Sequence, residues 1–144
     1  IRRASTPPNM SVFDAPTREV CTVKREITNT PLQALVLLND PQFFEASRIL
    51  AERMQKEAPN SIDESISYGF RLCTSRKPKE KELTLLKELY FKQLDKFKNN
   101  PKLAYEIFKS GEKFRDRSLN RYKTAAMSMV ANTMLNHDEV YMKR

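Results

Sequence analysis

The stretch that decides the fold is TNTPLQALVLLNDPQFFEASRILAERM, residues 28–54. It contains two helix starts of the same kind, because Thr30 and Asp40 are each followed directly by a proline. Thr and Asp side chains accept hydrogen bonds from the free N–H groups of a first helical turn, and proline suits the first helical position. Gln33 completes a capping box with Thr30. The stretch therefore predicts two consecutive helices, the second ending near Lys56.

The two predicted helices differ in the spacing of their apolar residues. In the first helix nearly every residue after the proline is apolar, and a helix that is apolar on all sides is expected to be buried. In the second helix apolar residues recur every three or four positions. This spacing predicts an inward stripe of Phe43, Ala46, Leu50 and Met54.

Capping residues predict a third helix over residues 62–74. Ser61 and Glu64 form a capping box at its start, and its apolar stripe ends at Cys73, which is interpreted as a small core residue. Gly69 lies in the middle of this helix, where glycine costs about 1 kcal/mol relative to alanine. Its presence there indicates close approach of a neighbouring helix.

Three more helices are expected further along the chain. A long one over residues 78–98 begins at a proline, and a short one follows Pro101 and ends before Gly111. After a polar connection, the last long helix runs from residue 119 or 120 to 135. Its expected inward face is Tyr122, Ala126, Met129, Val130 and Thr133.

These signals predict an all-α fold, an irregular and partly orthogonal bundle of about six helices. Residues 1–29 show no regular period and contain three prolines, so they are expected to form an extended N-terminal arm packed on the body of residues 30–144. We therefore expect one helical domain over residues 1–144. Because the chain starts at Ile1 rather than Met, we expect it to be a fragment of a larger protein.

Composition excludes several classes of protein and site. The chain has only two glycines, which disfavours all-β folds and phosphate-binding loops. No apolar run approaches the ~20 residues that span a bilayer, so no membrane span is predicted. Cys21 and Cys73 form no CxxC or CxxCH motif, which argues against a structural zinc site and covalent haem. A disulfide between them remains open if the protein is exported.

The positive charge of the chain is concentrated in its middle. The net charge is +8, and residues 71–123 alone carry 16 basic and 7 acidic residues. Such a segment could attract an acidic polymer, or it could be an ordinary lysine-rich solvated face. Tyr90, Phe91 and Phe97 interleave with lysines, as in some nucleic-acid-binding proteins. However, Tyr90 and Phe97 are needed on the inward stripe of their helix, so nucleic acid is disfavoured as a partner.

Four stretches of the chain resemble one known family. They are the opening stretch, PPNMSVFDAPTREVCTVKRE at residues 7–26, YGFRLCTSRKPKEKEL at residues 68–83 and MSMVANTMLNHDEVYMKR at residues 127–144. Taken in their order along the chain, these stretches resemble the C-terminal region of the Planctomycete-Specific Domain One family, domain of unknown function 1553. The resemblance extends over essentially the whole chain.

The resemblance implies a context rather than an activity. Family members look like large exported proteins, periplasmic or at the cell surface, associated with planctomycete-type cytochrome c domains. The expected role is therefore a non-catalytic interaction or structural module that packs on upstream domains of the same chain or on a cytochrome c-type domain. The alternative is a part of an enzyme or binding protein acting on polysaccharide, with its active site shared with upstream domains. No cofactor is expected in this fragment, although associated domains could hold haem.

Six residues are candidate contacts with a ligand or another domain. Five gather in the arm and at its junction with the first helix: Asp14, Arg18, Glu19, Arg25 and Asn29. They could bind a ligand, or they could form the ion pairs and caps that fix the arm to the helices, which is the favoured interpretation. The sixth is His137, the only histidine of the chain.

His137 has two interpretations. Beside Asp138 and Glu139 it could ligate a metal or act as a general acid or base, and with the nearby methionines it could ligate haem. No convergent partner is visible in the sequence, so a polar residue at a helix C-terminus is favoured. Methionines at helical spacing ordinarily fill a core. We therefore assign no catalytic, cofactor or metal residue from the sequence.

Overall fold

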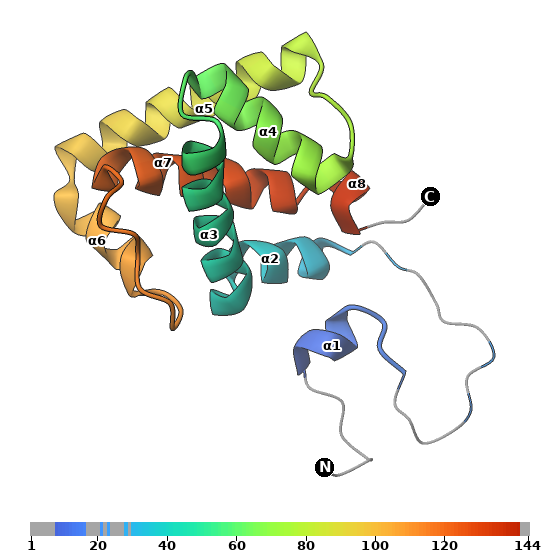
Figure 1. Cartoon of the computed structure of the whole chain (residues 1–144). Helices are drawn as coiled ribbons and strands as arrows, with labels where there is room; N and C mark the ends of the chain where they lie inside the picture. The colour runs from blue at the N-terminus through green and yellow to red at the C-terminus, as the bar shows by residue number, and fades with distance from the viewer. Residues whose placement is uncertain (1–7, 17–20, 22, 24–27, 29, 142–144) are drawn as a thin grey trace.

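Helices account for all the regular structure in the part of the chain that the computed structural model describes, residues 8–16, 21, 23, 28 and 30–141 (Figure 1). Six helices have nine or more residues and two are short. They are α1 (Pro8–Val12), α2 (Pro31–Asn39), α3 (Pro41–Glu57), α4 (Ile62–Thr74), α5 (Glu80–Asn99), α6 (Pro101–Lys109), α7 (Arg121–Leu135) and α8 (Asp138–Tyr141). The predicted all-α fold is confirmed.

The predicted caps define most of the helix starts. Thr30 and Gln33 form the expected capping box of α2, and Asp40 accepts a hydrogen bond from the backbone N–H of Gln42 at the start of α3. Ser61 accepts the backbone N–H of Glu64 at the start of α4. These contacts are local, which is why the sequence alone predicts them.

Two helix starts differ from the expectation. α5 begins at Glu80 rather than at Pro78, because the Glu82 side chain accepts the backbone N–H of Lys79 at 2.7 Å and makes residue 79 the cap. The arm was expected to be extended, yet it contains α1 over residues 8–12. A helix of five residues is too short to show a 3.6-residue period, so the pattern gave no signal for it.

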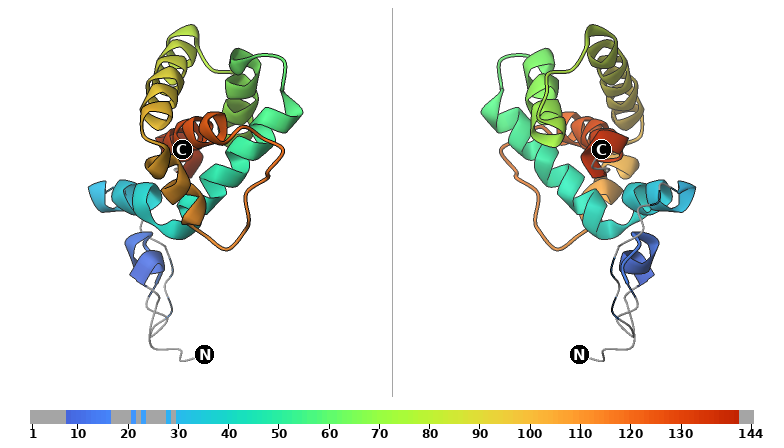
Figure 2. Two further views of the ribbon diagram at one scale, coloured as in Figure 1. Left: turned by 90° about the vertical axis from the view of Figure 1, so that its left-hand side faces the viewer. Right: turned by 90° about the vertical axis from the view of Figure 1, so that its right-hand side faces the viewer.

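α7 lies at the centre of the bundle. Figures 1 and 2 place α4 and α5 on one side of it and α2 on the other, and α3 crosses it steeply, so the bundle is partly orthogonal as expected. Because neighbours surround α7, its burial is broader than the predicted face. Ala125, Met127 and Ala131 are buried, whereas Met129 is only half-buried and Thr133 is exposed.

The predicted inward stripe of α3 holds only in part, since Met54 is fully buried but Phe43 and Leu50 are half-buried. In α5 Tyr90 and Phe97 are buried as expected, together with Leu86 and Leu94, and full burial of such a side chain contributes about 1.5–3 kcal/mol. In α3 the stripe is rotated, so that Ala46 is exposed while Ser47 and Arg48 are fully buried. The prediction failed because it assumed that a charged residue faces solvent. Among the described residues no helix is long and apolar enough to cross a bilayer.

Gly69 marks the close approach of α4 to α3, as the sequence predicts. A Cβ atom at this position would lie 2.5 Å from the Met54 Sδ atom and 2.9 Å from its Cγ atom. The Met54 side chain is fully buried, so it has little room to move away.

We expect Gly69→Ala to lower the free energy of unfolding by about 1 kcal/mol, because overpacking costs ~1–3 kcal/mol and exceeds the gain of about 1 kcal/mol in helix propensity. Urea denaturation measures this change. In a Met54→Ala background the space is free, and the same substitution should then be stabilising. Equal destabilisation in both backgrounds would show that the Met54 contact is not the cause.

Candidate functional site

The structure describes two of the six predicted contact residues, Asp14 and His137. The other four, Arg18, Glu19, Arg25 and Asn29, lie outside the described residues. Asp14 and His137 contact different partners and do not share one site.

Asp14 joins the arm to the start of α2. Its carboxylate accepts hydrogen bonds from the backbone N–H and the hydroxyl of Thr28, both at 2.8 Å. The buried side-chain amide of Gln33 donates to the Val12 carbonyl oxygen at 2.9 Å and to Thr28 Oγ1 at 3.1 Å, while its oxygen accepts the backbone N–H of Thr30 at 3.1 Å. Gln33 therefore caps α2 and holds the arm at the same time.

His137 lies half-buried just after α7. Its ring meets the edge of Phe70 at a centroid distance of 6.3 Å, and Nδ1 accepts the backbone N–H of Glu139 at 3.3 Å. Within the described part of the chain, no group of three His, Cys, Asp or Glu side chains is arranged to hold a metal ion. Cys21 is exposed and Cys73 half-buried, and both are free thiols.

Arg48 is a buried cation that sequence reasoning missed. Its side chain in α3 is fully buried, with Nη1 3.2 Å from Glu52 Oε1 and Nη2 3.5 Å from Glu45 Oε1. Nη2 also donates to the carbonyl oxygen of Lys113 at 2.5 Å, in the connection between α6 and α7. In sequence, a Glu–Arg–Glu set spaced three and four apart is typical of a solvated helix face. Only the position of the connection between α6 and α7, which is distant in sequence, shows that the Arg48 side chain is covered.

The same carboxylates fix the connection between α6 and α7. Glu45 Oε1 accepts the backbone N–H of Lys113 at 2.6 Å, which holds the pKa of Glu45 below its ordinary value. Glu52 Oε1 accepts the backbone N–H of Asp116 at 3.2 Å, and Asp116 pairs with Lys56. The connection is thus attached to α3 at several points although it has no regular structure.

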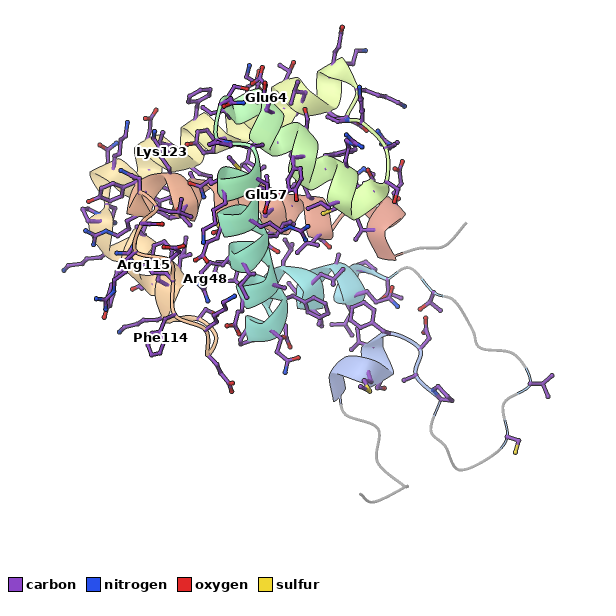
Figure 3. All side chains as sticks on the ribbon, in the orientation of Figure 1. Arg48, Glu57, Glu64, Phe114, Arg115 and Lys123 are labelled. Carbon is purple, nitrogen blue, oxygen red and sulfur yellow. The ribbon has the colours of Figure 1, made fainter. Side chains whose placement is uncertain are left out.

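The fixed connection presents an aromatic side chain to solvent. Phe114 is 92% exposed, and it lies between the basic residues Lys113 and Arg115. The guanidinium of Arg115 lies 5.3 Å from the ring centroid of Phe108. Figure 3 shows Phe114 and Arg115 on the connection beside the labelled Arg48 of α3.

We expect Arg48→Met to lower the free energy of unfolding by about 3–5 kcal/mol, because it leaves the buried Glu52 carboxylate without its cation. Chemical denaturation followed by circular dichroism measures the loss. The double variant Arg48→Met with Glu52→Gln removes the unpaired charge and should recover part of the stability. A loss below about 1 kcal/mol for Arg48→Met would contradict a role for this cation in holding the connection.

A second ion cluster ties the start of α5 to α8. Arg76 donates through Nη1 and Nη2 to both carboxylate oxygens of Glu82, at 2.9 and 2.8 Å, and through Nε to Glu139 at 2.8 Å. Its guanidinium also lies 4.8 Å from the ring centroid of Phe70. These bonds to Arg76 lower the pKa of Glu82 from its ordinary 4.5 to about 2.

The depressed pKa of Glu82 predicts a specific loss of stability in acid. The folded state favours the ionised form of Glu82. The contribution of this carboxylate to the free energy of unfolding is therefore complete above pH 4.5 and is lost as the pH falls towards 2. Melting temperature measured from pH 6 to pH 2 should fall steeply in this window, and Glu82→Gln should flatten part of the fall. The matched control is Glu88→Gln at an exposed carboxylate of the same helix, which should leave the profile unchanged.

Several hollows lie on the surface of the described part of the bundle. A cavity of about 640 Å³ between the start of α4 and the start of α7 is lined by hydroxyl and amide groups together with Tyr90, Phe91 and Lys123. A groove of about 400 Å³ with a mixed apolar and polar lining continues from Leu38 at the end of α2 along α5 and α6. A basic groove of about 390 Å³ is lined by Pro101, Lys102, Tyr105, Glu106, Lys109 and Arg121.

α2 presents an uncovered leucine face, defined here as Leu32, Leu35 and Leu38. Leu32 and Leu35 are 54% and 55% exposed, and Leu38 is also exposed. The prediction that this helix is buried is therefore wrong for this side. α2 packs on α1, α3 and α7, which cover its Gln33 and Leu37 side only.

Comparison with known proteins gives one match. The PSD1 family, described as "Protein of unknown function (DUF1553)", matches residues 1–90. This range includes α2, Arg48 with Glu45 and Glu52, and the first half of α5, and it ends before the basic groove. No curated protein and no solved structure matches the chain.

Proposed function

The chain belongs to the PSD1 family of proteins of unknown function, and we propose that it is a non-catalytic helical interaction module of a larger exported multidomain protein. The observation that carries this proposal is the leucine face of α2. The sequence of α2 is typical of a buried helix, yet Leu32 and Leu35 each expose more than half of their surface. Exposed apolar patches on folded proteins mark interaction surfaces.

The leucine face is held rigidly, which favours binding. Gln33 and Asp14 attach the arm to one end of α2, and Asn132 of α7 donates to the carbonyl oxygen of Leu38 at the other end. A surface that is already ordered loses little conformational entropy when a partner binds. Burial of each leucine would then contribute about 1.5–3 kcal/mol to association.

The groove that begins at Leu38 extends the leucine face. Leu38 belongs to both, and the groove continues past Phe44, Leu103 and Ile107. The partner we propose is a domain that precedes this one in the same polypeptide, and a cytochrome c-type domain carrying its own haem is the second candidate. The alternative of a shared polysaccharide-processing active site has no supporting observation, since Asp14 and His137 contact separate partners.

The test compares binding of this chain and of a Leu32→Ser, Leu35→Ser variant to the preceding region of the parent protein, produced as a separate polypeptide. Isothermal titration calorimetry should show saturable binding for the wild-type chain. The double variant should lose at least tenfold in affinity while its melting temperature stays within a few degrees, because both side chains are exposed.

The matched control is Leu72→Ser, Leu85→Ser, which removes two exposed leucines of α4 and α5. It should bind like the wild-type chain. The proposal fails if the wild-type chain does not bind the preceding region, or if the control variant loses as much affinity as the α2 variant.

A further inference from the structure

The basic groove lies where α6 meets the start of α7. The two elements contact each other, and Figure 1 shows α6 beside the N-terminal end of α7. Lys102 and Lys109 come from the two ends of α6, and Arg121 is the first residue of α7. Three cations from separate positions therefore converge on one groove of about 390 Å³.

The positive charge in and around this groove exceeds the negative charge of the nearby carboxylates. Residues 98–123 contain eight Lys and Arg side chains against three carboxylates, and one of these, Asp116, already pairs with Lys56 of α3. Lys102, Lys109 and Arg121 are exposed and form no ion pair with any carboxylate that the structure describes. The groove is consequently a site of positive potential that favours an anion.

Two further side chains give the groove features that a purely cationic surface lacks. Tyr105 is 56% exposed and offers a flat aromatic face, with Lys109 Nζ 5.2 Å from its ring centroid. Glu106 adds one carboxylate, a hydrogen-bond acceptor, to the same groove. Cation, aromatic face and acceptor thus lie within one small concave surface.

We propose that the basic groove binds a segment of an acidic saccharide. Its carboxylate or sulfate groups would pair with Lys102, Lys109 and Arg121, and the apolar C–H face of a sugar ring would pack on Tyr105. A sugar hydroxyl would donate to Glu106. The volume is at the lower end of the ~300–1,000 Å³ usual for small-molecule sites, which suits a short segment of the polymer. This inference is independent of the leucine face.

The composition of the groove disfavours a nucleic acid. The Glu106 carboxylate repels the anionic groups of either ligand, but each ring of an acidic saccharide carries free hydroxyls that can donate to it, whereas the backbone of DNA has none between its ends. Of the three aromatic residues that alternate with lysines in α5, Tyr90 and Phe97 are buried in the core and cannot stack on bases, which leaves Phe91 as the only exposed one of the three. An acidic sugar uses every group in the groove, whereas a phosphate backbone uses only the cations.

The experiment measures binding of the 144-residue chain to four probes by calorimetry. They are tetragalacturonic acid, a heparin tetrasaccharide, neutral maltotetraose and a dT12 oligonucleotide. We expect at least one acidic saccharide to bind, with an affinity that falls as salt rises, and maltotetraose not to bind. The first two probes distinguish a carboxylated from a sulfated ligand.

Exposed positions supply the variants, so the fold should be retained. Lys102→Gln with Arg121→Gln should weaken saccharide binding at least tenfold, and Tyr105→Ala should weaken it several-fold without changing its salt dependence. The charge-matched control is Lys77→Gln with Lys81→Gln; Lys81 is about 25 Å along α5 from its C-terminal end, from 1.5 Å per residue. This control should bind like the wild-type chain.

Glu106→Gln separates recognition of a sugar from attraction of any anion. If Glu106 accepts a hydroxyl, the substitution lowers or preserves saccharide affinity while raising the affinity for dT12. The proposal is overturned if Glu106→Gln strengthens saccharide binding, or if dT12 binds as tightly as the acidic saccharides. Absence of binding to both acidic saccharides at millimolar concentration, or an equal loss in the control variant, overturns it as well.

Discussion

Burial of α7 on almost all sides is the constraint from which the arrangement of the other helices follows. Ala125, Ala126 and Ala131 are fully buried, and their small side chains let α3 cross α7 closely. α7 contacts every helix from α2 to α6 and also α8. Because the connections between these helices are short, each helix has few ways to reach α7. The faces that point away from α7 are then the faces left for solvent or for partners.

The Arg48 cluster extends this core to the surface. The two terminal nitrogens of the fully buried Arg48 guanidinium donate to two carboxylates of α3 and to a backbone carbonyl oxygen of the connection, while Nε has no partner among the described residues. The same carboxylates accept backbone N–H groups of Lys113 and Asp116. A connection without regular structure therefore has a defined conformation. It leads directly into Asn120, which caps α7, so one cluster fixes both the exposed Phe114 and the start of the central helix.

Two surfaces with different chemistry lie on different elements of this framework. The leucine face on α2 suits an apolar protein partner, and the basic groove on α6 and α7 suits an anionic saccharide. The family match ends at residue 90, so it includes the first surface and not the second.

The amino-acid sequence was sufficient for the six longer helices and most of their starts, because a cap such as Thr30 or Asp40 contacts only the next few residues. It was also sufficient to predict the close approach of α3 and α4 at Gly69. Glycine destabilises the middle of a helix, so its presence there indicates that a larger side chain would not fit. The exposed leucines of α2 and the burial of Arg48 could not be predicted in this way. Whether a side chain is covered depends on residues distant in sequence, and here the packing of α7 and the path of the connection between α6 and α7 decide it.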